Sequence, residues 1–358
     1  MPAIDARTPT ISVVTAAYNE AANLPVLYQR LLRIFDDIET SWEWIVVDDH
    51  SKDATFGVVR EIAANDSRVR CIRLARNSGS HLALTCGLTL SRGQCAVLLA
   101  ADLQDPPETM PALLEKWRSG AQVVWAVRAL REGERASKLL FARSYYWIMR
   151  RIVGLPEMPP TGADFFLMDR RVIDAFCQFQ ESNISMLGLI TWMGFRQDRI
   201  DYVKHARLHG ASGWNLRKKL KLVVDSVTSF TYLPIRIMSY SGFCLALLGF
   251  LYAAATVYRS FSGIPVQGWA SLMVVVLVVG GFQILLMGVL GEYIWRALDE
   301  SRHRPRFLIE DTTPEFLSVA ATPAPDPAMH AGQSLVAPGQ GALRSPRSHH
   351  GTENADDC

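Results

Sequence analysis

Short apolar runs rich in β-branched residues alternate with longer amphipathic segments over the first 130 residues or so of the chain. The runs predict strands at Ile11–Thr15, Trp44–Val47, Val69–Leu74, Ala96–Leu99 and Val123–Val127. The segments between them predict helices at Ala22–Asp37, Thr55–Ala64, Ser80–Leu90 and Glu108–Ser119. Strands separated by helices of this length are typical of a mainly parallel, doubly wound α/β sheet, a Rossmann-like fold. Ligands bind such sheets beyond the carboxyl ends of the strands, so the polar residues after each strand form the candidate site.

Two longer stretches without any charged residue lie in the C-terminal half. Ile237–Val257 has 21 residues and Gly268–Gly291 has 24, and neither keeps the polar face of a helix in a soluble core. Each exceeds the roughly 20 residues that a helix needs to cross a bilayer. We therefore expect transmembrane helices at 235–258 and 268–296, joined by a short extracytoplasmic loop at 259–267. Two buried helices of a soluble bundle are the alternative.

The distribution of positive charge predicts the orientation of this hairpin. Only Arg259 lies between the spans, whereas basic residues flank them on both sides: Arg217, Lys218, Lys219, Lys221 and Arg236 before, and Arg296, Arg302, Arg304 and Arg306 after. Lys and Arg accumulate on the cytoplasmic side of membrane proteins, so both chain ends are expected in the cytoplasm and the protein in the inner (cytoplasmic) membrane.

The segments around the hairpin have distinct compositions. Residues 214–234 place apolar side chains on one stripe and a basic cluster at the start, which predicts an amphipathic interfacial helix; an inert juxtamembrane anchor is the competing interpretation. Residues 297–311 are expected to form a cytosolic basic segment. Residues 312–358 hold six prolines and one aromatic residue, which predicts a disordered tail. The N-terminus has no apolar run of the kind that signal peptides carry.

Overall charge and cysteine content exclude some classes of protein. The chain has 37 Lys and Arg against 35 Asp and Glu, a net charge of +2, which argues against a dedicated nucleic-acid binder. Its six cysteines form no CxxC pair and no Cys/His ligand spacing. Neither a zinc site nor a disulfide framework is indicated, and reduced thiols are expected.

Polar segments follow the first four predicted strands: AAYNEAANL (16–24), DDHSKDAT (48–55), RNSGSHLAL (76–84) and AADLQDPPE (100–108). None contains the glycine pattern of a dinucleotide fold or a P-loop. Asp102 and Gln104 could offer two oxygen ligands to one divalent cation, which would bridge to substrate phosphates. Asp48 and Asp49 fit such a site, but they also fit a turn followed by a helix cap.

The order of these segments resembles the GT-A catalytic domain of family 2 glycosyltransferases, expected here at residues 1–213. Later segments, TGADFFLMDRRV (161–172), RLHGASGWNLRKKLK (207–221) and GEYIWR (291–296), together with the two spans, resemble the polyprenyl-phosphate glycosyltransferases. That group includes dolichyl-phosphate mannose synthase and the bacterial undecaprenyl-phosphate glucosyl and aminosugar transferases. The resemblance covers roughly residues 10–310 and leaves the tail outside.

The resemblance implies a role for individual residues on the donor side. A nucleotide-sugar pocket would be lined by Ala16, Tyr18, Glu20, Val47, Asp49, Ala101, Asp102 and Ser212. A divalent cation, Mg²⁺ or Mn²⁺, would be held by Asp102 and Gln104. Many members of the family carry another Asp where this chain has Ala100, and a basic residue where it has Gly213. The first departure removes a possible metal ligand, and the second removes a positive charge near the diphosphate.

For the acceptor side, the resemblance assigns a phosphate-binding role to Arg128, and Arg131, Lys138 and Arg207 are further candidates. A lipid monophosphate is already ionised near pH 7, so it can attack the sugar without a general base. The protein then has to screen two anionic groups from each other. Asp164 would lie near the metal or the sugar hydroxyls; a turn carboxylate ahead of a helix around Arg170–Phe176 is the alternative. Asp102, Asp164 and Arg128 are thus the expected catalytic residues.

The resemblance therefore implies a metal-dependent enzyme that transfers one sugar from a nucleotide donor to a polyprenyl phosphate, with undecaprenyl phosphate as the first candidate. UDP-glucose is the first candidate donor and UDP-N-acetylglucosamine the second. No nucleic-acid partner is expected, and a homo-oligomer is left open. One alternative is a catalytically silent nucleotide-binding scaffold in the membrane. A processive polysaccharide synthase is the other, although that class needs a QxxRW segment and the chain has no Arg-Trp pair.

Overall fold

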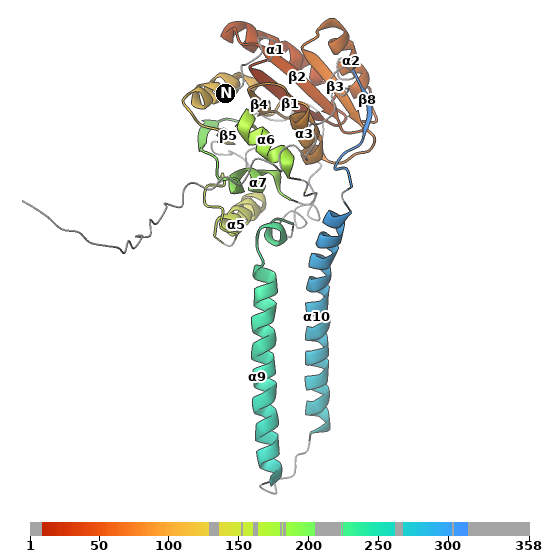
Figure 1. The fold of residues 1–358 in the computed structure, drawn as a ribbon, viewed down its shortest axis with the longest axis vertical. Coiled ribbons are helices and arrows are strands. Elements are labelled where there is room, and N and C mark those ends of the chain that lie inside the picture. The colour runs from red at the N-terminus through yellow and green to blue at the C-terminus, as the bar shows by residue number, and fades with distance from the viewer. Residues whose placement is uncertain are drawn as a thin grey trace, which may run out of the picture. The chain divides into compact units, whose positions relative to one another are not determined.

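The structure of the chain is a computed structural model (Figure 1). It describes residues 9–128, 136–151, 153–159, 164–179, 181, 184–204, 223, 225–261, 268–302 and 304–313.

The five predicted strands and four predicted helices are all confirmed, with small differences at their ends. The first part of the chain contains β1 (Ile11–Ala17), α1 (Leu24–Ile38), β2 (Trp42–Asp48), α2 (Thr55–Asn65), β3 (Val69–Leu74), α3 (Ser80–Thr89), β4 (Cys95–Leu98), a 3₁₀ turn (Pro107–Thr109), α4 (Met110–Arg118) and β5 (Val123–Arg128). Then come α5 (Ala136–Arg151), β6 (Phe166–Asp169), α6 (Arg170–Gln178), α7 (Met186–Trp192), β7 (Gln197–Tyr202), α9 (Leu233–Phe261), α10 (Trp269–Ser301) and β8 (Ile309–Thr312). The expected helix near Arg170–Phe176 is α6.

The strands form one sheet in the order β7-β5-β6-β4-β1-β2-β3-β8. Neighbours β4, β1, β2 and β3 are parallel, and so are β5 and β7. Strands β6 and β8 run antiparallel to their neighbours, so the sheet is mixed and mostly parallel. The carboxyl ends of β4, β1, β2 and β3 therefore lie at one edge of the sheet, as the sequence analysis required.

Helices cover both faces of the sheet (Figure 1). On one face, apolar residues of α1, α2 and α4 pack on alternate residues of the central strands, such as Val13 and Val46. On the other face α3, α6 and α7 pack on the intervening residues, such as Val14 and Val47. Helix α3 lies very close to the sheet, because a Cβ atom on Gly87 would fall 2.4 Å from Cγ1 of Val14. Glycine at this position allows α3 to approach the sheet.

Strand β8 changes two expected boundaries. It pairs with β3, with Thr312 opposite Ile72, so residues 309–311 of the expected basic segment form part of the sheet. Thr312 and Thr313, assigned to the tail from sequence, are ordered here as well. Thr313 is buried, its N–H donates to the carbonyl of Cys71 (3.0 Å), and its Oγ1 accepts the N–H of Cys71 (3.2 Å). The predicted start of the tail at residue 312 therefore lies at least two residues too early in the chain.

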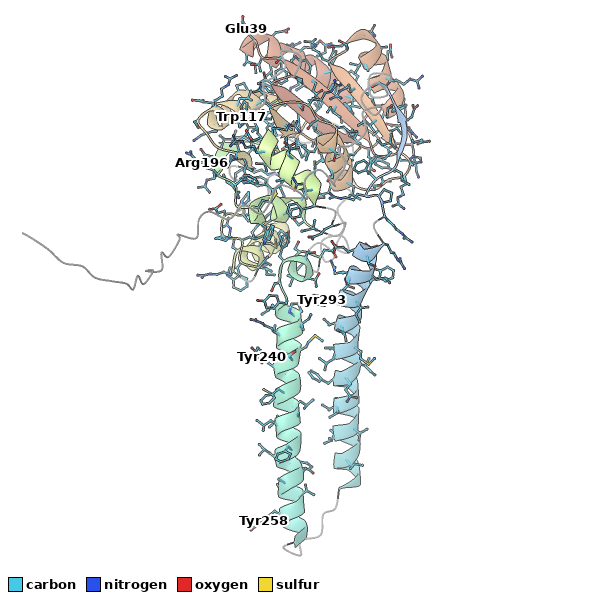
Figure 2. All side chains as sticks on the ribbon, viewed as in Figure 1. Glu39, Trp117, Arg196, Tyr240, Tyr258 and Tyr293 are labelled. Atoms are coloured by element: carbon cyan, nitrogen blue, oxygen red, sulfur yellow. The ribbon has the colours of Figure 1, made fainter. Side chains whose placement is uncertain are left out.

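Helices α9 and α10 correspond to the two expected spans and run side by side (Figure 1). Each contains a window long and apolar enough to cross a membrane, Leu233–Thr256 and Val274–Ser301, and neither window is buried against other parts of the described protein. Figure 2 places Tyr240 and Tyr258 along α9 and Tyr293 on α10. Of the expected interfacial helix at 214–234, the structure describes residues 223 and 225–234, and residues 225–230 are helical. The expected loop at 259–267 begins later than predicted, because α9 continues to Phe261, and residues 262–267 lie outside the described part of the chain.

Candidate functional site

Three loops meet at the carboxyl ends of β1, β2 and β3, and we call them the β1–β3 loops (residues 18–23, 49–54 and 75–79). The first two are joined by hydrogen bonds from backbone N–H groups to side-chain oxygens. The N–H of Asn19 donates to Oγ of Ser51 (2.9 Å), and the N–H of Lys52 donates to Oδ1 of Asn19 (2.9 Å). Asn19 adopts a positive φ of 57°, which Asn tolerates better than most residues. The loop that carries Tyr18 and Glu20 is thereby fixed to the loop that follows β2.

The predicted residues of the first loop are placed differently from one another. The ring of Tyr18 is exposed, and the N–H of Glu20 donates to Oγ1 of Thr55 (2.9 Å). Ala16 is partly buried at the end of β1. The side chain of Val47 is fully buried beneath α3 and packs in the core, so only the backbone of this residue is available to a pocket. The reason is the alternation of a strand, which points Val47 to the α3 face.

The two acidic residues after β2 have different partners. Asp48 is fully buried; its Oδ2 lies 3.0 Å from Nη1 of Arg73, and its Oδ1 accepts the N–H of Ser51 (3.0 Å). Asp49 accepts the N–H groups of Ser78 (2.6 Å) and Gly79 (2.8 Å), where Gly79 has a φ of 91°. Burial raises the pKa of Asp49, and the charge of Asp48 adds to this, against the opposing effect of the two N–H donors. Asp49 therefore ties the end of β2 to the start of α3.

The loop after β4 contains the expected metal ligands. Asp102 is largely buried, and its Oδ1 accepts the N–H of Gln104 (3.2 Å) across Leu103, which has a φ of 57°. Ala101 is buried in the core, so its side chain does not line a pocket. Within the described residues no three His, Cys, Asp or Glu side chains gather as metal ligands. A carboxylate and an amide oxygen still suit a hard cation that takes its remaining ligands from water and diphosphate.

A second group of polar and charged residues lies at the ends of the neighbouring strands and in the adjoining loops. We call it the β4–β7 cluster (Asp105, Arg128, Asp164, Tyr202 and Lys204). Nη2 of Arg128, at the end of β5, lies 2.5 Å from Oδ2 of Asp164. The Arg128 side chain is 9% exposed and that of Asp164 is 61% exposed. Burial lowers the pKa of Arg128, but Asp164, Tyr202 and Asp105 outweigh it and the net pKa is raised. Arg128 and Asp164, expected separately from the sequence as site residues, are thus brought together in space.

Asp105 is a part of this cluster to which the sequence analysis gave no role. It is fully buried, the hydroxyl of Tyr202 donates to it, and Nζ of Lys204 lies 3.1 Å from its Oδ1. Burial, together with the charge of Asp105, raises the pKa of the Tyr202 hydroxyl well above its usual range. The sequence signal was the Asp-Pro-Pro that follows Gln104, but its partners lie on β7, a strand that the pattern did not predict.

Other predicted site residues cannot be placed. Arg131, Arg207 and Ser212, as well as the departure at Gly213, lie outside the described residues, and Lys138 is described only by its backbone in α5. One cavity of about 630 Å³ is lined by residues such as Pro9, Trp42 and Arg68. It lies at the starting ends of the strands, opposite the edge where ligands bind in α/β sheets.

Comparison with known proteins agrees with this geometry. The Glycosyl transferase family 2 pattern matches residues 12–176, and the GtrB C-terminal hairpin matches residues 233–297. The uncharacterized glycosyltransferase YkcC of Bacillus subtilis (strain 168) is 37% identical over 300 residues, which are 84% of this chain and 93% of YkcC. The chain belongs to glycosyltransferase family 2. This glycosyltransferase has the mixed, mostly parallel sheet of the GT-A fold.

Two further relatives carry a more specific name. The bactoprenol glucosyl transferase of Shigella phage SfV is 36% identical over 303 residues, covering 84% of this glycosyltransferase and 98% of the phage protein. The prophage bactoprenol glucosyl transferase homolog of Escherichia coli (strain K12) is 34% identical over 302 residues, covering 84% and 98%. Both alignments are long enough to include the catalytic domain and the hairpin.

Proposed function

We propose that this glycosyltransferase transfers one sugar from a nucleotide-sugar donor to the phosphate of a polyprenol. Undecaprenyl phosphate is the first candidate acceptor. The observation that carries the proposal is the similarity to bactoprenol glucosyl transferases over nearly their full length, hairpin included. UDP-glucose is the first candidate donor and UDP-N-acetylglucosamine the second. The products are a polyprenyl-phosphate sugar and a nucleoside diphosphate.

On the donor side, the β1–β3 loops would bind the nucleotide. The exposed ring of Tyr18 offers a surface for the base. Glu20 and Asp49 lie on the same set of loops, which are held by hydrogen bonds from backbone N–H groups to side chains. Ser212 is a further candidate for the diphosphate. A divalent cation, Mg²⁺ or Mn²⁺, held by Asp102 and Gln104, would offset the charge of the diphosphate as it leaves.

On the acceptor side, Arg128 is the described cation best placed to bind the lipid phosphate. Its partner Asp164 is exposed, so a phosphate that arrives from solvent can compete with this carboxylate for the guanidinium. The acceptor phosphate is already anionic and needs no general base; the work of the protein is to bring two anions together. Arg131, Lys138 and Arg207 would add positive charge around the same phosphate.

The hairpin would hold this reaction at the membrane. We infer that α9 and α10 span the inner membrane with the catalytic domain and both chain ends in the cytoplasm. The apolar windows support the two spans, and the basic residues on both sides of the hairpin support the orientation.

The test uses membranes that contain the full-length protein. They are incubated with labelled UDP-glucose or UDP-N-acetylglucosamine, a short polyprenyl phosphate and Mg²⁺ or Mn²⁺. Transfer of label to the organic phase, abolished by a chelator and restored by added metal, is the expected result. Label in a long polymer would favour a processive synthase instead, and nucleotide binding without any transfer would favour a silent scaffold.

A further inference from the structure

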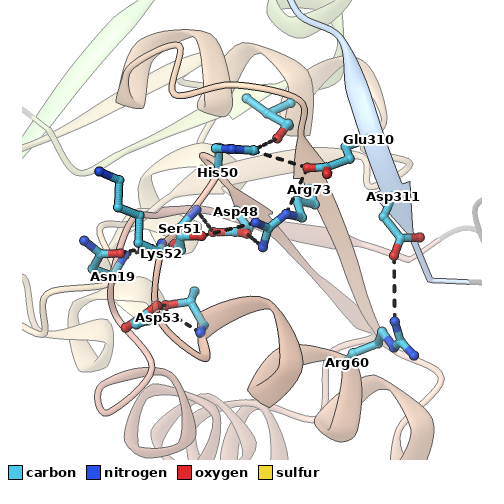
Figure 3. Close-up of polar contacts among 12 residues, drawn as sticks. Asn19, Asp48, His50, Ser51, Lys52, Asp53, Arg60, Arg73, Glu310 and Asp311 are labelled. Atoms are coloured by element: carbon cyan, nitrogen blue, oxygen red, sulfur yellow. Dashed lines mark hydrogen bonds and ion pairs between the residues drawn. The ribbon is translucent and has the colours of Figure 1, made fainter.

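Strand β8 brings a short acidic segment from beyond the second hairpin helix to the edge of the β1–β3 loops (Figure 3). Glu310 and Asp311 are neighbours on this strand and are equally exposed, 46% and 49% by side chain. Their contacts differ. Glu310 contacts Arg73 and His50, whereas Asp311 lies 3.7 Å from the exposed Arg60 on α2.

Glu310 holds Arg73 from the outside of the sheet. Its Oε2 accepts a hydrogen bond from Nε of Arg73 (3.0 Å). The other two nitrogens of the same guanidinium point inward, Nη1 to Oδ2 of Asp48 (3.0 Å) and Nη2 to the carbonyl of Ser51 (3.2 Å). A guanidinium is planar and rigid, so fixing Nε also fixes the direction of the two inner hydrogen bonds.

These inner bonds lead directly to the loops that carry the candidate nucleotide-binding residues. Ser51 is held by Asp48 through its N–H and accepts the N–H of Asn19 at its Oγ (2.9 Å). Asn19 stands between Tyr18 and Glu20 in the sequence. A continuous path of hydrogen bonds therefore runs from Glu310 through Arg73 and Ser51 to the loop after β1.

A second, shorter path passes through His50. Its Nδ1 lies 3.2 Å from Oε2 of Glu310 and 3.1 Å from the carbonyl of Leu74. His50 adopts a positive φ of 59° and directly follows Asp49. Non-glycine residues in this conformation are held there by their surroundings. Glu310 thus contacts the residue next to Asp49 as well as the arginine behind it.

We propose that Glu310 is a positioning residue for the nucleotide pocket, so that the segment following the hairpin completes the donor site. This inference rests on the proposed function in one respect, that the β1–β3 loops bind the nucleotide. Glu310 itself does not contact the substrate. This role also gives a reason why a strand from the far end of the chain is paired with β3.

The experiment compares Glu310→Gln with Asp311→Asn in the full-length protein in detergent. Both substitutions remove one exposed carboxylate from β8 and conserve side-chain size, but only the first removes the negative charge that faces Arg73 and His50. Affinity is measured by calorimetry with UDP, and with GDP in parallel, in the presence of Mn²⁺. Steady-state transfer to a short polyprenyl phosphate and thermal unfolding are measured on the same preparations.

We expect Glu310→Gln to raise the dissociation constant of the bound nucleotide and the KM of the donor by roughly fivefold, an effect in the range of a single partly exposed ion pair. The KM of the lipid acceptor should stay unchanged, and Asp311→Asn should match the wild type in all of these values. Equal nucleotide affinity in the two variants would overturn the proposal. So would a parallel rise in both KM values of Glu310→Gln, since that pattern indicates general loosening of the fold.

Different results would contradict the proposed function rather than the role of Glu310. If the wild type transfers no sugar to polyprenyl phosphate but Glu310→Gln still weakens nucleotide binding, the acceptor is wrong and the role of Glu310 stands. If the wild type binds neither UDP nor GDP, the β1–β3 loops are not a nucleotide site, and the positioning role proposed for Glu310 is then wrong as well.

Discussion

The β1–β3 loops and the β4–β7 cluster lie at the same edge of one sheet, and both contain a fully buried carboxylate with a cationic partner, Asp48 with Arg73 and Asp105 with Lys204, but only the cluster also pairs a buried cation with an exposed carboxylate. At the β1–β3 loops the carboxylates of Asp48, the last residue of β2, and of Asp49 are buried, and backbone N–H groups and Arg73 satisfy them. In the β4–β7 cluster a buried cation, Arg128, is paired with an exposed carboxylate, Asp164.

This difference matches the two halves of the proposed reaction. A pocket for a nucleotide gains affinity when its loops are fixed before the ligand binds, because less ordering is needed on binding. A site for a lipid phosphate has to offer a positive charge that its resting partner can release. We expect changes in the β1–β3 loops to alter donor binding and changes in the β4–β7 cluster to alter use of the acceptor.

The largest effect is expected at the residue that stands between the two regions. Asp102→Asn removes the only carboxylate proposed to bind the metal and should reduce the rate of transfer by about 100-fold or more. The measurement is the initial rate at saturating donor over a range of Mn²⁺ concentrations. Asp37→Asn, an exposed position on α1, is the matched control and should leave the rate unchanged. If Asp102→Asn keeps both the wild-type rate and the wild-type dependence on Mn²⁺, the metal site lies elsewhere.

The next effect concerns the acceptor. Arg128→Gln should lower transfer by about 100-fold, mainly by weakening the interaction with the lipid phosphate in the transition state, while the affinity for UDP stays close to that of the wild type. Asp164→Asn should have a smaller effect by itself. Because the two side chains are in contact, the double variant should be no worse than Arg128→Gln alone. Additive losses would contradict a shared role for this pair.

A smaller effect, on stability, is expected where α3 packs on the sheet below the β1–β3 loops. Gly87→Ala forces a methyl group against Val14, and overpacking of this kind costs about 1–3 kcal/mol. Thermal unfolding should show a lower midpoint. Gly57→Ala on α2 meets no atom within 4 Å and should be neutral or stabilising by up to about 1 kcal/mol. Similar midpoints for both variants would show that α3 can move away from the sheet.

The buried strands were predictable from the sequence because β1 to β5 are apolar runs with a helix after nearly every one. The later strands were not. FLMD in β6 has four residues, QDRIDY in β7 is mostly polar, and IEDT in β8 is acidic, so their pairing depends on neighbours that are distant in the sequence.

The same limit applies to the site. Family motifs pointed to Asp102, Arg128 and Asp164, and the structure pairs the last two. They could not reveal that Asp105 binds Tyr202 and Lys204, or that Glu310 reaches Arg73, because both contacts depend on β7 and β8. The burial of the Val47 side chain beneath α3 was not predictable either, because a motif does not say which face of its strand a side chain occupies.

The central claim is that the phosphate of the lipid itself accepts the sugar. The most direct measurement offers the purified protein a short polyprenyl phosphate and, separately, the polyprenol of the same length, each with the donor and Mn²⁺, and determines the mass of the product. The account predicts a product only from the phosphate, heavier by a single sugar. A glycosylated polyprenol, or a lipid carrying several sugars, would contradict it.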